Sequence, residues 1–321
     1  MIHLPGESPD LDANALRVVR AVHETGSITA AAVALGYSQP AVSQQLKRLE
    51  QRLGLSVVER VGRGVRLTEA GLVLARHAVT VATALDAAAG EIAELQGLRA
   101  GLVRLVAFPS ASATLVPSLL ARMKARHSQI SVTYLEAEPP EAVAAVRENR
   151  ADLAITFSYP GDRVDPHRDS AQGLRVATLR RDEMMLVLPV GHSLDSVTPI
   201  DLGELADENW VAGCPRCRGH LLDLCDRRGF APRISYETDN VAAVFGLVEA
   251  GIGVALLPAL AIESVGRRAG VSIRATTGRD HRTLHAVTAV RAERVPALAA
   301  ALGVLDAISL LDVSSDPGPI L

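Results

Sequence analysis

The chain has 321 residues, a length at which more than one domain is expected. Hydrophobic residues make up 48% and charged residues 21%, which excludes a disordered protein, and only 3% aromatic residues argues against a surface that stacks single-stranded nucleic acid. The net charge of −3 is unevenly distributed, since residues 13–66 hold eight lysines and arginines against three glutamates. A local basic surface of this kind is what contact with phosphate groups requires.

The sequence gives no sign of export or of a membrane span. Its first ten residues, MIHLPGESPD, lack the basic start and apolar run of a signal peptide, and we expect residues 1–10 to form a disordered extension. The longest apolar run, Gly251–Ile262, is interrupted by Pro258 and is too short to cross a bilayer. Three cysteines are too few for a disulfide scaffold. We therefore expect a cytoplasmic protein that does not bind membranes.

Two helices joined by a tight turn are predicted to follow a first helix over Leu11–Glu24. Apolar residues recur at helical spacing in Ile28–Leu35 and again in Ser38–Gly54, with a glycine in the turn between them. Ser38 can cap the second of these helices, and Pro40 falls in its first turn, where a missing N–H costs nothing. This layout predicts a helix-turn-helix whose outward face carries amides and cations.

That outward face offers the chemistry for reading duplex DNA. Glutamine can pair with an adenine edge, and lysine or arginine with guanine or phosphate. An ordinary amphipathic core helix is the alternative, but residues 57–67 then predict two short strands around the turn Gly62–Gly64, a basic wing that could place Arg63 at the backbone or in a minor groove. The predicted DNA-contacting residues are Ser38, Gln39, Pro40, Ser43, Gln44, Lys47, Arg48, Arg63 and Arg66.

A long helix is predicted from a Thr68 cap to about Leu98. It could pack on its own domain, but a helix that leaves a small winged domain has little else to bury against, so we favour dimerisation. A dimer also suits DNA, since two half-sites then form a pseudo-palindrome. Its apolar positions repeat at spacings of three and four, close to a coiled-coil seam, and are Leu72, Ala75, Val79, Ala82, Leu85, Ala89, Ile92 and Leu95.

Beyond a glycine-bounded boundary at residues 97–101, strands and helices alternate. Such alternation gives parallel strands with helices on the faces of a sheet, as one large sheet or as two lobes. The predicted strands are Leu102–Phe108, Ile130–Leu135, Leu153–Phe157, Met184–Val190, Val211–Gly213, Ile234–Glu237, Ile252–Leu257 and Leu284–Val290. The predicted helices are Ala113–Arg126, Glu141–Asn149, Leu221–Arg228, Val241–Ala250, Ala259–Arg267 and Val295–Leu310.

The stretch Thr25–Gly71 resembles the DNA-binding domain of the LysR-type transcriptional regulators. The matching elements are Gly-Ser before the second helix, Ala-Ala within it, Ser-Gln-Pro-Ala-Val-Ser opening the third, and Leu-Glu and Leu-Gly at its end. One departure is Val57-Val58 where the family usually has Leu-Phe, which is a core substitution. Looser motifs, including ADLAITF at 151–157 and AGIGVALLP at 250–258, resemble the family's two-lobed, periplasmic-binding-protein-like effector domain.

The resemblance implies an α+β multidomain chain and the boundaries of its domains. These are a winged helix-turn-helix over 11–68, a linker and dimerisation helix over 69–98, an effector domain over 99–311 and a flexible tail over 312–321. Crossovers near Leu179–Asp182 and Ile273–Thr276 would separate lobe one, about 101–179 and 275–311, from lobe two, about 180–274. The implied protein is a homodimer or homotetramer that binds a pseudo-palindromic promoter site in double-stranded DNA, works with RNA polymerase and responds to a small-molecule effector.

An effector site is expected beyond the carboxyl ends of strands, at helix N-termini. The turn Pro109–Thr114 offers hydroxyl and amide groups to an anion, although serine and threonine also cap helices, and Asp239 is as apt to cap its helix as to meet a ligand. The effector's identity stays open, and no cofactor is predicted. The residues predicted to line the cleft are Ser110, Ser112, Thr114, Phe157, Ser158, Gly213, Cys214, Thr238 and Asp239.

Cys214, Cys217 and Cys225 all fall within the segment CPRCRGHLLDLC. One interpretation is a thiol switch, in which Arg216, Arg218 and a helix N-terminus lower the pKa of Cys217. A metal site that adds His220 is weaker, because the chain has no second Cys-x-x-Cys pair, and no metal ligand is predicted. The third interpretation is a set of small buried residues in a pocket wall.

An enzyme is not predicted. The sequence has no Gly-x-Ser-x-Gly, His-Glu-x-x-His or Walker-type motif, and no Gly-x-Gly-x-x-Gly after a strand. Two alternatives to an effector-responsive regulator remain. One keeps the DNA binding but senses redox state or metal through the three cysteines, and the other is a solute-binding protein, which the missing signal peptide and the fused winged domain oppose.

Overall fold

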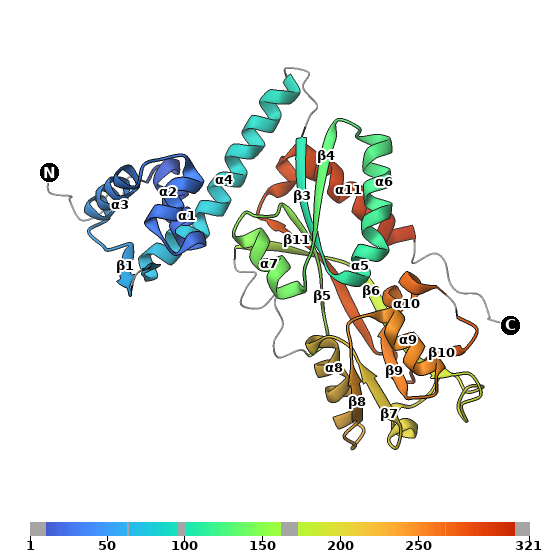
Figure 1. The fold of residues 1–321 in the computed structure, drawn as a ribbon. Coiled ribbons are helices and arrows are strands. Elements are labelled where there is room, and N and C mark those ends of the chain that lie inside the picture. Colours follow the sequence, from blue (N-terminus) through green and yellow to red (C-terminus); the bar gives the residue numbers. More distant parts are fainter. Residues whose placement is uncertain (1–10, 63, 96–100, 162–172, 267, 312–321) are drawn as a thin grey trace.

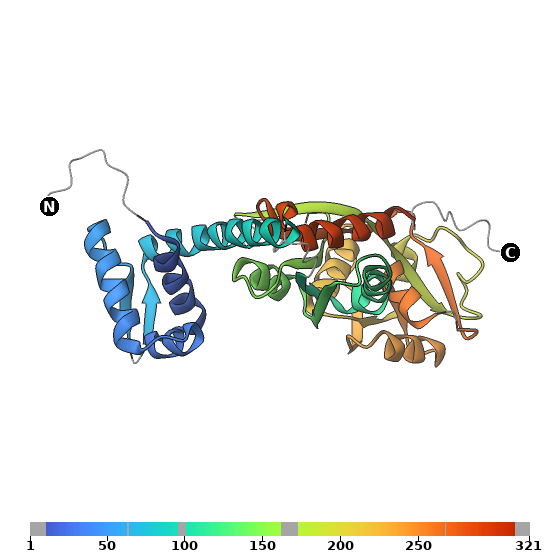
Figure 2. The same cartoon turned by 90° about the horizontal axis from the view of Figure 1, so that it is seen from above.

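A computed structural model describes residues 11–62, 64–95, 101–161, 173–266 and 268–311, and the expectations for the extension, the tail, the boundary at 97–100 and Arg63 concern residues outside these ranges. A small helical domain, a long helix and a larger α/β part follow one another along the chain (Figure 1), which confirms the predicted fold class. Seen from above, the molecule is elongated, with the helical domain at one end (Figure 2).

The N-terminal domain forms where its sequence signals lie. Asp12 caps the first helix by accepting from the Ala15 N–H at 2.7 Å, and Gly26, Gly36 and Gly54 end the three helices in left-handed conformations. The elements are α1 (Ala13–Thr25), α2 (Ile28–Leu35), α3 (Gln39–Leu53), β1 (Val58–Val61) and β2 (Gly64–Leu67), followed by α4 (Glu69–Leu95).

The wing formed by β1 and β2 is held against the helices by hydrogen bonds that backbone N–H groups donate. The Glu50 carboxylate at the end of α3 accepts from the N–H groups of Val57 at 2.8 Å and Val58 at 3.3 Å. On the other strand, the Val65 N–H donates to the Gly26 carbonyl at 3.0 Å. The wing therefore has a fixed position relative to α3.

Helix α4 connects the two parts of the chain and packs on both. Thr68 caps it by accepting from the Gly71 N–H at 3.2 Å. Ala75 belongs to the core of the winged domain and Val79 to the main core of the α/β part, so these two members of the expected seam pack within their own chain. The segment Glu69–Ala89 is long and apolar enough to cross a membrane by length and composition alone, and its place in two cores accounts for part of that apolar character.

The α/β part is built on a nine-stranded mixed sheet. The strand order is β4-β3-β5-β11-β6-β9-β7-β8, with β10 paired to β6. Strands β3, β4 and β5 are parallel, and β11 runs antiparallel to both β5 and β6. The strands are β3 (Gly101–Ala107), β4 (Ile130–Glu136), β5 (Leu153–Ser158), β6 (Leu174–Pro189), β7 (Asn209–Ala212), β8 (Arg233–Glu237), β9 (Val254–Pro258), β10 (Val271–Ala275) and β11 (His281–Ala289).

The helices cover both faces of this sheet (Figure 1). One apolar cluster around Phe108, Leu153 and Trp210 runs through the whole part, and smaller clusters lie under α7 and α9. The α-helices are α5 (Pro109–Ala113), α6 (Leu115–Arg126), α7 (Pro139–Arg147), α8 (Pro215–Asp226), α9 (Val241–Glu249), α10 (Ala259–Val265) and α11 (Pro296–Leu311), with short 3-10 helices η1 (Leu202–Leu205) and η2 (Ala292–Arg294).

Strand β6 joins two lobes. It pairs with β11 up to Glu183 and with β9 and β10 from Met184 onward, and the chain returns from β10 to β11 through residues 276–280. We call lobe one the half that contains β3, β4, β5 and β11, and lobe two the half that contains β7 to β10.

Four predicted elements need correction. The strand predicted at Met184 begins at Leu174, because the charged run LRRDE hides the alternation of a strand whose partner is supplied from far along the chain. Strand β10 was missed because its five residues include Ser272 and Arg274. Helix α8 begins at Pro215 instead of Leu221, since Cys214 acts as its cap. The helix predicted over Ala113–Arg126 is broken at Thr114, whose backbone is not helical.

Candidate functional site

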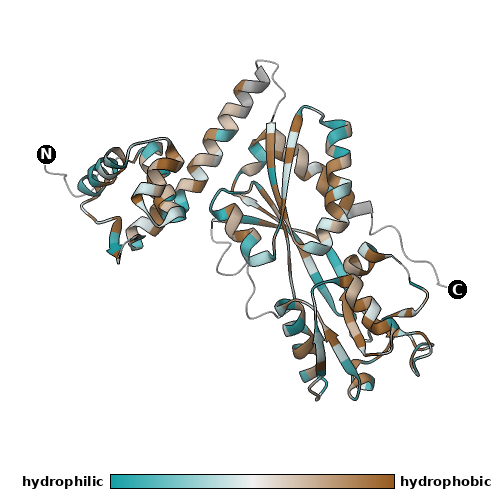
Figure 3. Cartoon of the chain, in the orientation of Figure 1, coloured by the Kyte–Doolittle hydropathy of each residue, from teal (hydrophilic) through white to brown (hydrophobic). Residues whose placement is uncertain are grey.

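The exposed face of α3 carries most of the predicted DNA-contacting side chains. Gln44, Lys47 and Arg48 are exposed, and Gln39 donates from Nε2 to the half-buried Ser43 hydroxyl at 2.9 Å. Val42, Leu46 and Leu49 lie on the opposite, buried face. Figure 3 shows α3 as a largely hydrophilic helix, in contrast to the more apolar α4. Ser38 is exposed and caps α3 by accepting from the Ala41 N–H at 3.4 Å.

Two arginines of the wing, Arg60 and Arg66, have different surroundings. Arg66 lies opposite Glu59 in the β1–β2 register and donates from Nε at 2.9 Å and Nη2 at 2.6 Å to its carboxylate. This guanidinium is therefore already paired, although it remains exposed to solvent. Arg60, which sequence reasoning did not select, is exposed on β1.

Two contacts brace α3 against α1. Arg52 near the end of α3 donates to Asp12 at 2.9 Å, and the Tyr37 hydroxyl in the turn donates to Asn14 at 3.3 Å. The pKa of Asp12 is lowered, first by the Ala15 N–H and then by Arg52. Neither bracing residue of α1 was predicted, because an isolated acidic or amide side chain carries no motif.

A buried ion pair lies where β6 and β11 pass between the lobes. Arg282 donates from Nε to Asp182 at 2.7 Å and from Nη2 to the Ser110 hydroxyl at 2.7 Å, while the Leu260 N–H donates to the second Asp182 oxygen at 3.0 Å. Arg282 is 2% and Asp182 4% exposed. Burial disfavours the charged guanidinium, but Asp182 and the neighbouring Tyr159 and Cys217 keep the pKa of Arg282 above its ordinary value.

Aromatic rings surround this guanidinium. Its central carbon lies 4.8 Å from the ring centre of Phe108 and 4.6 Å from that of Phe157, and Phe157 meets both Phe108 and Tyr159 edge-on. His220 stacks on Tyr159 with the ring centres 3.9 Å apart. Of these groups, Phe157 was among the predicted effector residues and His220 was considered only as a metal ligand, whereas Phe108, Tyr159 and Arg282 were not selected.

The structure brings some of the predicted effector residues together and gives others a local role. Ser112 and Thr114 donate to the carbonyls of Phe108 at 2.9 Å and Ser110 at 2.7 Å, so their hydroxyls serve the turn itself. The Ser158 hydroxyl is bonded to His285 at 2.8 Å. Ser110, Phe157 and Cys214 do lie around the buried arginine or its neighbours.

On lobe two, Gly213 lies against both Cys217 and Thr238. A Cβ atom added to Gly213 would be 3.6 Å from the Cys217 Cβ and 4.0 Å from the Thr238 carbonyl oxygen. Asp239 does not cap α9, because the Asn240 side chain does so by accepting from the Ala242 N–H at 3.0 Å. Asp239 instead acts electrostatically on Glu138 of lobe one. Together with burial, which is the larger cause, it raises the pKa of Glu138 at the start of α7, and one carboxyl oxygen of Glu138 is buried without a hydrogen-bond partner among the described residues.

Two of the three cysteines meet at the start of α8. The Cys214 and Cys217 sulfurs are 2.8 Å apart, the Cys217 N–H donates to the Cys214 sulfur at 3.4 Å, and the Tyr159 hydroxyl donates to the Cys217 sulfur at 3.5 Å. The hydrogen bond from Cys214 lowers the pKa of Cys217 to about 7, with further help from Arg282 and Tyr159 against the effect of burial. Cys214, which keeps the shared proton, has a raised pKa.

The predicted surroundings of Cys217 were wrong in one respect. Arg282 is the cation that favours its thiolate, whereas Arg216 lies over the Phe157 ring at 5.3 Å and Arg218 pairs with Glu237 at 3.0 Å. Cys225 lies apart in the core, where burial raises its pKa to about 11. Within the ranges that the structure describes, no group of three or more histidine, cysteine or carboxylate side chains could hold a metal, so the metal interpretation gains no support.

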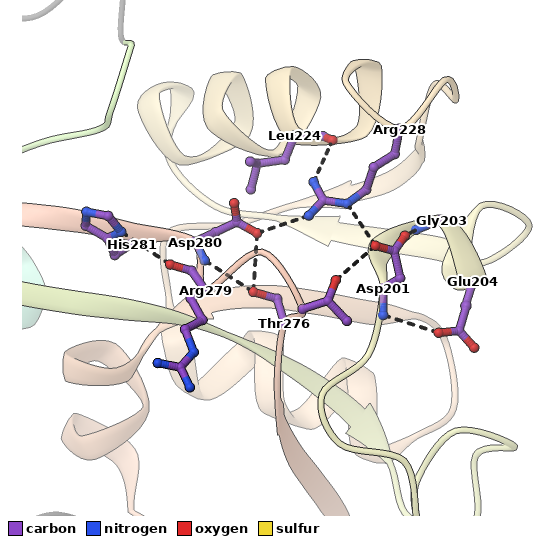
Figure 4. A network of polar contacts seen from close by, with 10 residues as sticks. Asp201, Gly203, Glu204, Leu224, Arg228, Thr276, Arg279, Asp280 and His281 are labelled. Atoms are coloured by element: carbon purple, nitrogen blue, oxygen red, sulfur yellow. Dashed lines mark hydrogen bonds and ion pairs between the residues drawn. The ribbon is translucent and has the colours of Figure 1, made fainter.

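The far end of α8 is tied to the return crossover between the lobes (Figure 4). Arg228 lies 3.5 Å from Asp201 and 3.4 Å from Asp280 and also donates to the Leu224 carbonyl at 3.1 Å. Asp280 accepts from the Thr276 hydroxyl at 3.2 Å, which closes the crossover loop. Helix α8 thus reaches from the cysteine pair to the loop that joins β10 to β11.

Comparison with known proteins identifies both parts of the chain. Residues 13–72 match the bacterial regulatory helix-turn-helix proteins of the lysR family, and residues 96–308 match the LysR substrate binding domain. A probable hydrogen peroxide-inducible genes activator of Mycobacterium avium is 30% identical over 285 residues, which is 83% of this chain and 88% of that protein.

Solved structures show the same fold. A full-length variant of OxyR from Pseudomonas aeruginosa aligns with a TM-score of 0.68 and 19% identity, over 92% of this chain and 95% of that one. Full-length CbnR complexed with its target DNA aligns with a TM-score of 0.51 and 19% identity, over 92% of this chain and all of that one.

Proposed function

Because the chain belongs to the LysR family of DNA-binding transcriptional regulators, with an N-terminal helix-turn-helix and a C-terminal effector-binding domain, we propose that it binds a pseudo-palindromic promoter site as a homodimer or homotetramer. The exposed face of α3, on a helix whose other face is fully buried, carries this proposal. Gln39, Ser43 and Gln44 would read base edges in the major groove, and Lys47 and Arg48 would meet phosphate or guanine. Arg63 and Arg66 of the wing would contact the backbone or the minor groove.

Footprinting on the DNA upstream of the gene that encodes this chain tests the DNA contacts. Gln39→Ala and Ser43→Ala should weaken specific binding while leaving the oligomer intact, because each removes a polar group from the exposed face. Gln129→Ala and Ser131→Ala, on an exposed loop and strand of lobe one, are matched controls that should bind like the wild type. Unchanged affinity of both α3 variants would show that another surface contacts the site.

Helix α4 would supply the contact between subunits. After Ala75 and Val79 are packed within the chain, Leu85 and Ile92 still stand 54% and 55% exposed on one side of the helix, with Ala89 between them. Apolar side chains at this spacing fit a helical pair. The subunits of such a dimer would each present one α3 to a half-site.

The small-molecule effector would bind between the lobes, near Ser110, Phe157 and Arg282, with Cys214, Gly213, Thr238 and Asp239 contributing from lobe two. Ser110 supports this place because its hydroxyl accepts from Arg282, a cation that also pairs with Asp182 and lies over the rings of Phe108 and Phe157. A carboxylic acid is the chemistry that these groups favour. A panel of small carboxylic acids, tested for their effect on the footprint and on thermal unfolding, should contain one whose effect Ser110→Ala removes.

The protein would work in the cytoplasm, together with RNA polymerase at the promoter. Support for both comes only from the family to which the chain belongs. In vitro transcription from the footprinted promoter tests the second point, since the rate should change when the protein is added.

A further inference from the structure

The strongest feature that the proposed function does not use is the pair formed by Cys214 and Cys217. The two sulfurs are 2.8 Å apart at the first turn of a twelve-residue helix, and both thiols are free. A disulfide has a bond length of about 2.0 Å, so closing the bond moves the sulfurs by less than about 1 Å. Helix α8 already holds the two side chains side by side, which removes most of the entropic cost of bringing them together.

We propose that Cys214 and Cys217 are an oxidation site, at which a small hydroperoxide converts the two thiols into a reversible disulfide. Cys217 is the group that attacks, and Cys214 is the group that completes the bond. Cys225 takes no part, because it lies in the core away from the pair.

The surroundings of Cys217 suit a nucleophile. Its sulfur accepts from the Tyr159 hydroxyl at 3.5 Å, and the positive charges of Arg282 and of the helix start favour its thiolate. Burial and, to a smaller extent, Glu138 just before α7 oppose the thiolate, and the hydrogen bond from Cys214 is the largest favourable contribution. Cys217 is half-buried and Cys214 is 8% exposed, so a small oxidant fits this site better than a bulky one.

The chemistry balances in two steps. The Cys217 thiolate attacks one peroxide oxygen, so that an S–O bond forms and the O–O bond breaks. The departing hydroxide takes a proton to become water, or the departing alkoxide of an organic hydroperoxide takes one to become an alcohol. The Cys214 sulfur then attacks the Cys217 sulfur, so that the S–S bond forms, the S–O bond breaks, and the leaving hydroxide takes the Cys214 proton. The two thiols lose two electrons and two protons overall, and the peroxide is reduced.

The disulfide would also change the interactions at the start of α8. It removes the thiol-to-thiol hydrogen bond, and the negative charge that Tyr159 and Arg282 face disappears. Arg228, two residues beyond the other end of the same helix, is bound to the crossover loop at Asp280. The oxidation site is therefore connected to the joint between the lobes by one rigid element.

The position of Arg216 between the two cysteines gives a direct assay. Trypsin cuts after arginine and separates Cys214 from Cys217 unless a disulfide links the two peptides. We would treat the reduced full-length protein with hydrogen peroxide, block free thiols in acid, digest it and measure peptide masses. The expected product is a linked Cys214–Cys217 pair, lower in mass by two hydrogens and released by a thiol reductant, with Cys225 still alkylated.

Four variants make the result decisive. Cys214→Ser and Cys217→Ser should each abolish the linked peptide, while Cys225→Ser should form it at the wild-type rate. Tyr159→Phe keeps the ring but removes the hydroxyl donor, and it should move the pH midpoint of Cys217 alkylation upward. Peroxide treatment that leaves both thiols free, or a linkage that includes Cys225 or a second chain, would overturn the proposal. None of these readouts depends on DNA binding.

Discussion

Arg282 donates to Asp182 at 2.7 Å inside the interior, and the two residues stand 100 positions apart in the sequence. The pair joins β11 to β6 at the level where both strands leave lobe one, and its remaining hydrogen bonds reach Ser110 in one lobe and Leu260 in the other. A buried pair of this kind costs much when only one partner is removed, because the other charge is left without compensation.

We therefore predict that Arg282→Ala lowers the free energy of unfolding of the α/β part by about 3–5 kcal/mol. The single tryptophan, Trp210, is fully buried in the same core, so its fluorescence during urea unfolding reports on this part of the chain. Arg175→Ala is the matched control, since Arg175 pairs with Glu293 at 3.2 Å on the surface, and it should cost less than about 1 kcal/mol. Similar losses in the two variants would contradict the importance assigned to the buried pair.

The two lysines of the chain allow a clean test of phosphate contact. Lys47 lies on the exposed face of α3 and Lys124 on the exposed side of α6, and no other lysine is present. Lys47→Ala should weaken binding to all DNA sequences and reduce the slope of log affinity against log salt by about 1, because one fewer counterion is released. Lys124→Ala should leave both affinity and slope unchanged. The measurement is a titration of labelled promoter DNA at several salt concentrations.

A charged substitution on the exposed side of α4 tests whether this side forms the proposed subunit contact. Leu85→Glu should shift the protein from dimer toward monomer, because it places a carboxylate in the proposed helix pair. Val190→Glu, at a lobe-two residue that is 58% exposed against 54% for Leu85, should not change the association state. Sedimentation velocity over a range of concentrations distinguishes the outcomes, and an unaltered dimer in the Leu85 variant would place the interface elsewhere.

The start of α1 predicts a dependence on pH. The pKa of Asp12 is lowered in the folded chain, first by the Ala15 N–H, so its stabilising effect is present above the ordinary aspartate pKa and is lost as the pH falls through the folded value. Asp12→Ala should reduce hydrogen-exchange protection of α1 by about 1 kcal/mol at pH 7, the usual value of such a cap. The difference from the wild type should shrink below about pH 4.

Asp12→Asn is the matched variant for this prediction. Asparagine caps a helix as well as aspartate does, but it cannot form the charged contact with Arg52. It should therefore lose less protection than the alanine variant and show no change as the pH falls below 4. A loss equal to that of alanine would mean that the ion pair, and not the cap, holds the start of α1.

Local signals were sufficient for the N-terminal domain. Ser38, Pro40 and Gly54 each act within a few residues of their own position, and these are the residues that begin and end α3 in the structure. Such caps depend on short-range backbone hydrogen bonds, which a single sequence displays.

Long-range contacts were not available to the sequence. Strand β6 becomes a strand over Leu174–Glu183 because β11 lies beside it, and nothing in its own charged residues indicates that partner. Likewise Arg282 bonds to Ser110 of the proposed effector site and acts on Cys217 because the fold brings it there, and no motif marks it. For the same reason the thiol interpretation selected Arg216 and Arg218, the sequence neighbours of Cys217, whose guanidinium groups lie over Phe157 and pair with Glu237.

Strand β6 also limits how the two lobes can move. It runs without interruption from Leu174 to Pro189 and is hydrogen-bonded to lobe one at its start and to lobe two at its end. A continuous strand resists bending at a point but tolerates twisting along its length. Relative motion of the lobes should therefore be a rotation about the axis of β6, with the loop at 276–280 as the second attachment. A ligand or a disulfide at the joint would change the angle between the lobes more than their separation.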